Sequence, residues 1–317
     1  MSDLHFGVTP WRSDASGGAE SLAAQGERAE ALGFASFWLP ESHFGTRAAL
    51  PQPLLCLAAI AARTRAIRLG TTSYLLPIRH PIQVAEEVAV LDRLSAGRVI
   101  LGIGRGFRSD LFSTFGVPSR EKRDRFGAAV DAMVRAWRGE PVAFDGEGSS
   151  PVLLSPLPVQ QPHPPLWVAA FGPKAVEQAG RLGLPYLASP IEPLAALIEN
   201  YARHRSVSEQ ARAACVPVMR TVFVCDDDAL EQRVREALVV QSAALAAARA
   251  PALRSSASAD VAAFALVGSR AQVADAIGGH REALGLTHLI ARVQVPGAEP
   301  PAIEAALEQL AELAAAL

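Results

Sequence analysis

A short polar stretch after an apolar run holds the residues best suited to proton transfer. Glu41, Ser42 and His43 follow the apolar residues 37–39 and Pro40. An imidazole titrates near neutral pH without perturbation, so His43 is the best candidate proton donor or acceptor. A lone histidine is more often a satisfied structural residue, and this remains the alternative for His43.

A second group of residues suits an anion. Arg105 stands between Gly104 and Gly106. Glycines let the backbone approach a ligand, and the guanidinium offers a planar fork of donors that matches a phosphate. The alternatives are a tight turn at the end of a strand and a pairing of Arg105 with Asp110 or Glu121.

A third candidate lies at the expected start of a helix, at Gly172, Pro173 and Lys174. The free N–H groups of a helix N-terminus favour anions, whereas a lysine in the first turn opposes the helix dipole. A phosphate bound there accounts for the lysine; an ordinary solvated lysine is the alternative.

Composition excludes several other kinds of chemistry. The 317 residues include 30 basic and 32 acidic side chains, which disfavours a nucleic-acid partner. No carboxylate pair or cluster with metal-ligand spacing stands out, and the three cysteines are widely spaced, so we expect neither a metal site nor a disulfide framework. No apolar run has the length and purity of a membrane span, and no signal peptide is recognised, so we expect a cytoplasmic protein.

The scaffold that must position these residues alternates short apolar runs with longer amphipathic stretches. The expected strands start near residues 4, 36, 67, 98, 166, 186, 216 and 288. Apolar runs of this kind are typical of parallel strands covered by helices. Eight β/α units predict an α/β fold, a (β/α)8 TIM barrel forming one domain over residues 1–317, with insertions after strands 4 and 7 at residues 104–165 and 226–287. A doubly wound open sheet is the alternative, but no glycine-rich phosphate loop follows the first strand.

Helix signals mark several boundaries between these strands. Pro81 suits the first turn of a helix, which then ends at Ser95-Ala96-Gly97. Other helices are expected over residues 19–32, 52–65, 123–137, 228–248 and 272–284. The Pro-, Gly- and Ser-rich residues 142–164 predict a hairpin or a long excursion.

In a TIM barrel, residues just after the strands line the active site. Most of the residues in these positions are apolar, aromatic or neutral polar, which predicts a site for a flat organic ligand with an anionic tail. The aromatic residues expected in the pocket wall are Trp11, Phe44, Tyr74, Phe107 and Phe171, although Trp11 also fits a core position.

The chain resembles the bacterial luciferase-like flavin-dependent monooxygenases through motifs that follow one another over nearly its whole length. These motifs are ALGF (31–34), FWLPESHF (37–44), IRLGTT (67–72), LPIRHP (76–81), AEE (85–87), LDRLSAGR (91–98), GIGRG (102–106), FGVP (115–118), PHPPLWV (162–168) and VGS (267–269). Together they are specific, although each one alone is weak.

This resemblance implies a barrel that binds reduced FMN, or a deazaflavin coenzyme in related branches, and uses O2 to oxygenate a substrate. The flavin phosphate would lie on Arg105 and Gly106 and on the 171–174 loop, where Phe171, Gly172 and Lys174 are candidate contacts. A non-proline cis peptide is implied at Thr72–Ser73, against the flavin ring. Glu41 would be either a flavin-ring contact or a structural carboxylate.

The sequence departs from luciferase itself after the second strand, where luciferase has Glu-His-His and its first histidine is catalytic. In a gapless alignment Ser42 occupies that catalytic position and His43 the next one, so Ser42 and His43 are the candidate catalytic residues. Light emission from an aldehyde is therefore doubtful.

The leading hypothesis is a monooxygenase that oxygenates a small, mainly apolar organic substrate with FMN reduced by a separate flavin reductase. The alternatives are a deazaflavin-dependent hydride-transfer oxidoreductase and a flavin-binding protein without turnover. The apolar helix expected over residues 52–65 and the family resemblance favour a homodimer, with burial under N-terminal loops as the alternative. Residues 246–262, rich in Ala and Ser, predict either a lid or a loop without a role.

Overall fold

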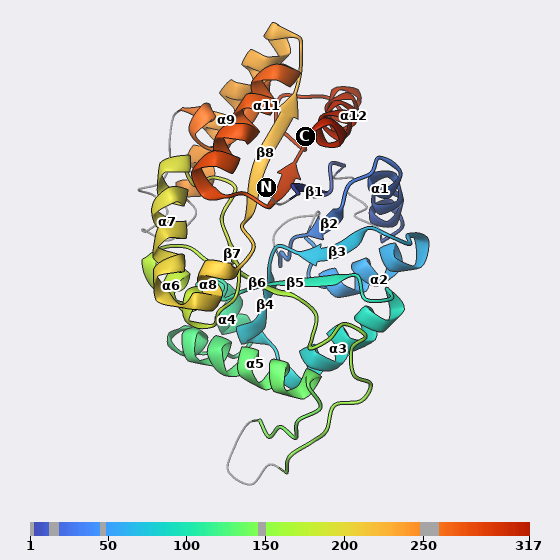
Figure 1. Cartoon of the computed structure of the whole chain (residues 1–317), viewed down its shortest axis with the longest axis vertical. Coiled ribbons are helices and arrows are strands. Elements are labelled where there is room, and N and C mark those ends of the chain that lie inside the picture. The colour runs from blue at the N-terminus through green and yellow to red at the C-terminus, as the bar shows by residue number, and fades with distance from the viewer. Residues whose placement is uncertain (1–2, 13–18, 45–48, 145–149, 248–259) are drawn as a thin grey trace. The chain divides into compact units, whose positions relative to one another are not determined.

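Short parallel strands alternate with helices along the chain (Figure 1). This computed structural model describes residues 3–12, 19–44, 49–144, 150–247 and 260–317. Backbone packing divides the chain into two units. Unit 1 comprises Met1–Asp14, Arg28–Trp38 and Val168–Leu317, and unit 2 comprises Ala15–Glu27 and Leu39–Trp167.

Unit 1 is built on a ladder of parallel strands with largely buried side chains. Strands β1 (His5–Val8) and β10 (His288–Arg292) pair in the register His5↔His288, and β10 pairs with β8 (Pro217–Val224) in the register Leu289↔Val218. On the other side of β1 lies β2 (Ser36–Leu39), and β9 (Ala265–Gly268) pairs with β8. A further parallel pair joins β6 (Leu166–Ala169) to β7 (Tyr186–Leu187).

The helices of unit 1 follow these strands. They are α6 (Pro173–Arg181), α7 (Leu194–Val207), α8 (Glu209–Ala213), α9 (Asp228–Ala247), α11 (Arg270–Leu284), α12 (Pro300–Ala316) and the 3-10 helix η3 (Val261–Ala263). Reciprocal bonds between Ser269 and Gln272 cap the start of α11, and Gly285 ends it with a φ of 72°. Glycine adopts this left-handed conformation without a steric penalty, so the end predicted at this residue is confirmed.

Unit 2 contains three parallel strands in two pairs. Strand β5 (Val99–Gly104) pairs with β3 (Arg68–Thr71) through Leu69↔Val99 and with β4 (Tyr74–Leu75) through Tyr74↔Ile103. Its helices are α2 (Pro53–Arg63), α3 (Pro81–Leu94), α4 (Ser109–Thr114) and α5 (Lys122–Trp137), with 3-10 turns η1 (Leu76–Ile78) and η2 (Ser119–Glu121). Helix α3 packs against α2 and α5, and the Trp137 indole donates to the carbonyl of Ala85. Helix α1 (Ala19–Ala31) contributes residues to both units.

The segment after α5 runs away from α3 and β5 and contacts them again at Gln160. Val142 and Val152 form an antiparallel bridge, as expected for a hairpin. The Gln160 amide then donates 2.7 Å to the buried carboxylate of Asp92 and 2.8 Å to the carbonyl of Val99, and its backbone N–H donates 2.9 Å to Asp92. One side chain thus attaches the returning chain to both α3 and β5.

A charged side chain is buried in the interior of unit 1. The guanidinium of Arg220, on β8, is fully buried, and its Nε donates 3.2 Å to His280 Nε2 on α11. His280 Nδ1 lies 2.9 Å from the carbonyl of Ala276, so Nδ1 carries the proton and Nε2 accepts. Burial, with Arg220 as the second cause, lowers the pKa of His280 to about 4, and burial lowers the pKa of Arg220 to about 10.

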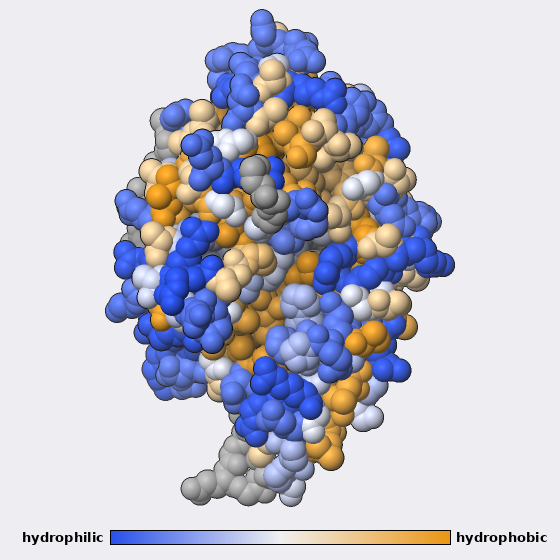
Figure 2. All heavy atoms as spheres, in the orientation of Figure 1, coloured by the Kyte–Doolittle hydropathy of each residue, from blue (hydrophilic) through white to orange (hydrophobic). Residues whose placement is uncertain are grey.

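Polar and apolar side chains are intermixed on the face shown in Figure 2. Among the large apolar side chains that are exposed, Leu55 on α2 is 72% accessible and Leu94 on α3 is 64% accessible. Both lie on helices that pack together in unit 2. Helix α2 lies within the apolar helix, expected over residues 52–65, at which the sequence predicts a dimer contact.

The eight predicted strands all appear, as β1, β2, β3, β5, β6, β7, β8 and β10, and the α/β class is confirmed. Two strands were not predicted. Strand β9 was missed because its four apolar residues, Ala265–Gly268, sit between an Ala/Ser-rich stretch and a helix, and β4 was missed because it has only two residues. Closure into a barrel, the positions of its insertions and the single-domain organisation stay predictions. Most of the lid predicted at 246–262 lies outside the described residues.

Candidate active site

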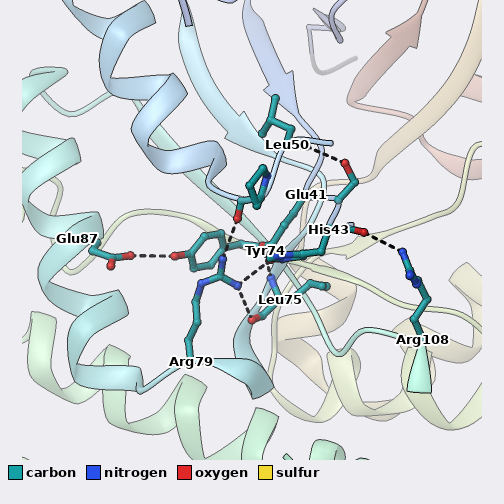
Figure 3. Close-up of polar contacts among 10 residues, drawn as sticks. Glu41, His43, Leu50, Tyr74, Leu75, Arg79, Glu87 and Arg108 are labelled. Atoms are coloured by element: carbon teal, nitrogen blue, oxygen red, sulfur yellow. Dashed lines mark hydrogen bonds and ion pairs between the residues drawn. The ribbon is translucent and has the colours of Figure 1, made fainter. Parts of the chain in front are cut away.

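The carboxylate of Glu41 is the centre of the candidate site in unit 2 (Figure 3). Glu41 lies just beyond the carboxyl end of β2, and its side chain is 0% exposed. Oε1 lies 2.5 Å from His43 Nε2 and 2.8 Å from Arg79 Nη1, and Oε2 accepts from the backbone N–H of Leu75 at 2.9 Å. Both carboxylate oxygens of Glu41 therefore accept hydrogen bonds from the protein itself. This favours a structural role for Glu41 over a contact with the flavin ring.

Arg79 is itself held in place from several sides. Its guanidinium lies 3.9 Å from the centroid of the Tyr74 ring, and it donates to the carbonyls of Leu75 (3.0 Å) and Pro51 (3.3 Å). The hydroxyl of Tyr74 donates 2.8 Å to Glu87. Burial, reinforced by Glu87 and Glu41, raises the pKa of Tyr74. Tyr74 is fully buried and supports Arg79, and its predicted place in the pocket wall stays a prediction.

Ser42 forms two hydrogen bonds with Leu50, eight residues further along the chain. Its backbone N–H donates to the carbonyl of Leu50, and the N–H of Leu50 donates 3.0 Å to Ser42 Oγ. The hydroxyl thus closes the loop that carries Glu41 and His43. This contact gives Ser42 a structural role in the described chain, and its catalytic role stays a prediction.

Aromatic rings surround the imidazole of His43. Phe115 meets it edge-on with 5.3 Å between ring centroids, and Phe44 lies 5.6 Å away and stacks on Phe115. The carbonyl of His43 accepts 2.9 Å from Arg108 Nη1. Phe44, Phe115 and Phe107 are all exposed in this structure, so apolar surface lies beside the buried imidazole.

The turn after β3 lies directly against the end of β5. The Thr72–Ser73 peptide is cis, as the family resemblance implied. The N–H of Thr72 donates to the carbonyl of Leu39, which places this turn beside the end of β2. A Cβ atom on Gly104 would lie 2.2 Å from Ser73 Oγ, so a larger residue here would displace the Ser73 side chain.

Three basic side chains gather where β5 ends. Burial and the charge of Arg123 lower the pKa of Arg105, and burial with the charges of Arg105 and Arg123 lowers the pKa of Lys122. Lys122 Nζ lies 3.4 Å from the carbonyl of Gly106. Lys122 and Arg123 open α5, where the helix dipole disfavours positive charge. We call these three residues the cationic cluster; an anion bound there would relieve the repulsion.

Sequence reasoning found only one residue of the cationic cluster. The sequence predicted a helix from Arg123 and gave neither Lys122 nor Arg123 a place in this site, although basic residues at a helix start were a usable signal, as they were at Lys174. Of the two carboxylates considered as partners of Arg105, Asp110 pairs with Arg108 and Glu121 pairs with Arg120. A pairing of Arg105 stays an alternative.

The other predicted site residues belong to unit 1. Trp11 is buried, packs edge-on against Phe37 and donates 2.8 Å from its indole to Glu304, as expected for a core residue. Gly172 directly precedes α6 and has a φ of 74°, and the half-buried Phe171 comes just before Gly172. Lys174 lies in the first turn of α6, and its side chain is exposed. The roles predicted for Phe171, Gly172 and Lys174 in phosphate binding stay predictions.

A hollow of about 630 Å³ lies elsewhere in unit 2. It is lined by His80, Ile82, Gln83, Val142, Phe144, Ser150 and Val152. None of the predicted site residues is among them.

No helix of the described residues is long and apolar enough to span a membrane. Within the same residues, no group of three or more His, Cys, Asp or Glu side chains is arranged to hold a metal ion.

Comparison with known proteins identifies the family. The family model for luciferase-like monooxygenases matches residues 4–288. The chain belongs to this family. Such a match supports an oxidoreductase, which agrees with the enzyme class expected from the motifs.

Similar proteins include several monooxygenases. The oxygenase component of a flavin-dependent trigonelline monooxygenase from Acinetobacter baylyi is 34% identical over 163 residues, which are 50% of this chain and 45% of that protein. The chain spans roughly half the length of the first curated relatives that it matches, from 45% to 59%.

Solved structures match over nearly the whole chain. Monooxygenase RslO1 from Streptomyces bottropensis is 29% identical with a TM-score of 0.78, and the match covers 98% of both chains. The oxygenating constituent of 3,6-diketocamphane monooxygenase from Pseudomonas putida, solved with FMN, is 20% identical with a TM-score of 0.77 and covers 100% of this chain and 99% of that one. Proteins that depend on coenzyme F420, a deazaflavin, also share the fold.

Proposed function

We propose that this protein is a flavin-dependent monooxygenase that binds reduced FMN and uses O2 to oxygenate a small, mainly apolar organic substrate. The observation that carries the proposal is the cationic cluster, formed by Arg105, Lys122 and Arg123 beside the Gly104–Gly106 turn. Burial and the charge of Arg123 lower the pKa of Arg105, and burial with the charges of both arginines lowers the pKa of Lys122, so this cluster suits a strongly anionic group.

The donors of the cluster fit a phosphate monoester. Arg105 offers a planar fork, Lys122 is a point charge, and α5 directs the N–H groups of its first turn towards the same end. Gly106, with a φ of 70°, has no side chain to block the approach. A bound flavin would supply the redox chemistry, whereas the protein binds it, orients it and excludes water.

The residues around Glu41 would handle protons beside the flavin. His43 is the group that can donate or accept a proton, held by Glu41 at Nε2. Phe44, Phe107 and Phe115 supply exposed apolar surface that would exclude water once a substrate covers it. The backbone of Thr72 and Ser73 would lie against the flavin ring.

Equilibrium binding to the flavin-free protein tests the phosphate site. FMN and riboflavin share the ring and differ in the phosphate, so their affinity ratio isolates the contribution of the cluster. Arg105→Met should weaken FMN binding about 10- to 100-fold, as expected for a lost charge-assisted contact, and leave riboflavin binding nearly unchanged. Arg135→Met is the matched control, because Arg135 pairs with Glu140 on the surface of unit 2. Equal losses for both ligands would contradict the assignment.

A deazaflavin-dependent hydride transferase is the second candidate, because F420-dependent proteins share the fold. Anaerobic titration with FMN and with F420 separates the two. Turnover with ¹⁸O2, a flavin reductase and a panel of apolar ketones, aldehydes and terpenes should then place ¹⁸O in a product. FMN binding without ¹⁸O incorporation would instead indicate a flavin-binding protein without oxygenase activity.

The remaining features of the proposal concern partners and organisation. The name of the trigonelline relative, an oxygenase component, supports a separate reductase as the source of reduced FMN. The exposed Leu55 and Leu94 support a homodimer through α2 and α3. A cytoplasmic location and a (β/α)8 barrel over residues 1–317, with insertions at 104–165 and 226–287, complete the proposal.

A further inference from the structure

We propose that Glu41 and Arg79 act as a positioning pair, which fixes His43 as its Nε2–H tautomer and leaves Nδ1 as the nitrogen that exchanges a proton. The role of His43 in turnover rests on the proposed function, whereas the tautomer can be tested without it. The inference gives Arg79, which no sequence argument singled out, a defined part in the site.

The contacts of the carboxylate decide the tautomer. Glu41 receives a backbone N–H from Leu75 and a guanidinium N–H from Arg79, and its side chain is fully buried. A carboxylate with two such donors stays ionised and is purely an acceptor. At 2.5 Å from Oε1, His43 Nε2 must therefore be the donor, so the proton of the neutral imidazole resides on Nε2.

Arg79 shares the oxygen that holds His43. Nη1 of Arg79 and Nε2 of His43 both bind Oε1, at 2.8 and 2.5 Å. The guanidinium therefore holds in place the oxygen atom that accepts the Nε2 proton. Removing either the carboxylate or the guanidinium should weaken the preference for the Nε2–H tautomer.

The pair is itself rigid. The Tyr74 ring and the carbonyls of Leu75 and Pro51 hold the guanidinium, and Glu87 holds the Tyr74 hydroxyl. On the other side of the imidazole lie Phe115 and Phe44, which restrict rotation of the ring.

Several charged and titratable groups among the described residues face this network. Glu41 contacts the imidazole, Arg79 acts through Glu41, and Arg108 binds the His43 carbonyl. Behind them, Tyr74 and Glu87 contact Arg79 rather than His43.

Two-bond ¹H–¹⁵N spectra of the flavin-free protein labelled with ¹⁵N-histidine test the inference, with His43→Gln assigning the signals. The wild-type protein should show a protonated Nε2 and an unprotonated Nδ1 at pH 8. In Glu41→Gln the share of the Nε2–H tautomer should fall, because an amide can donate as well as accept, and in Arg79→Gln it should fall by less, because the carboxylate is still present. Arg79→Lys should return the tautomer ratio towards the wild-type value.

Glu27→Gln is the matched control, because Glu27 pairs with Arg63 on the surface of the same unit. A protonated Nδ1 in the wild type, or an unchanged tautomer ratio in the Glu41→Gln and Arg79→Gln variants, would overturn the inference. If Glu41→Gln does not fold, the Arg79→Gln and Arg79→Lys pair decides the result. If the protein shows the expected tautomer by NMR but incorporates no ¹⁸O, that result would refute the proposed function and leave the inference about the tautomer standing.

Discussion

The interior of unit 1 should make the protein sensitive to acid through one histidine. His280 accepts a hydrogen bond from the buried Arg220 through the nitrogen that would have to take up a proton. Protonation would break this bond and place two cations together. The pKa of His280 is therefore lowered to about 4 from the ordinary 6.5.

The sign and size of the effect follow from proton linkage. As the pH falls below about 7, the unfolded chain takes up the proton first, so the free energy of unfolding decreases. A difference of 2.5 units between the two states lowers that free energy by about 2 kcal/mol at pH 5 and by about 3 kcal/mol below pH 4. Above pH 7 the contribution of this histidine is fully present.

Urea denaturation at pH 8 and pH 5 measures the effect. His280→Gln keeps an acceptor for Arg220 but removes the titration, so it should lose about 2 kcal/mol less than the wild type between these two pH values. His5→Gln, at an exposed histidine of the same unit, should lose as much as the wild type. Equal losses in the wild type and His280→Gln would refute the reasoning, because other titrating groups contribute equally to both.

Three further outcomes are expected. Lys122→Gln should weaken FMN binding about tenfold and reduce its dependence on salt in fluorescence titrations, and an unchanged salt dependence would remove Lys122 from the phosphate site. Gly104→Ala should displace Ser73, which a Cβ atom would approach to 2.2 Å, and lower FMN and riboflavin affinity together; wild-type affinity for both would contradict the contact between this turn and the flavin ring. Leu55→Glu combined with Leu94→Glu should yield a monomer in sedimentation velocity if α2 and α3 form the dimer contact, and an unchanged dimer would place the interface elsewhere.

The elements were largely predictable from local sequence because their signals are local. Pro81 begins α3, Ser95 ends it, and Gly285 ends α11 as expected. The glycines around Arg105 were also informative, since Gly104 permits a close approach and Gly106 adopts a positive φ.

The partners of the site residues were not predictable in the same way. Nothing in the spacing of His43 and Arg79 shows that both bind one oxygen of Glu41, because the contact depends on how two loops pack. The position of Tyr74 after a strand likewise does not reveal that its hydroxyl reaches Glu87 on α3. Tertiary contacts of this kind require coordinates.

The attachment of Gln160 to Asp92 and Val99 has a consequence for protein engineering. Because Gln160 fastens the returning chain, and Arg93 donates to the carbonyl of Leu157 just before it, these contacts lie between the Val142–Val152 bridge and β5 along the chain. A peptide tag or fluorescent reporter inserted next to this bridge should therefore leave the β5 scaffold intact.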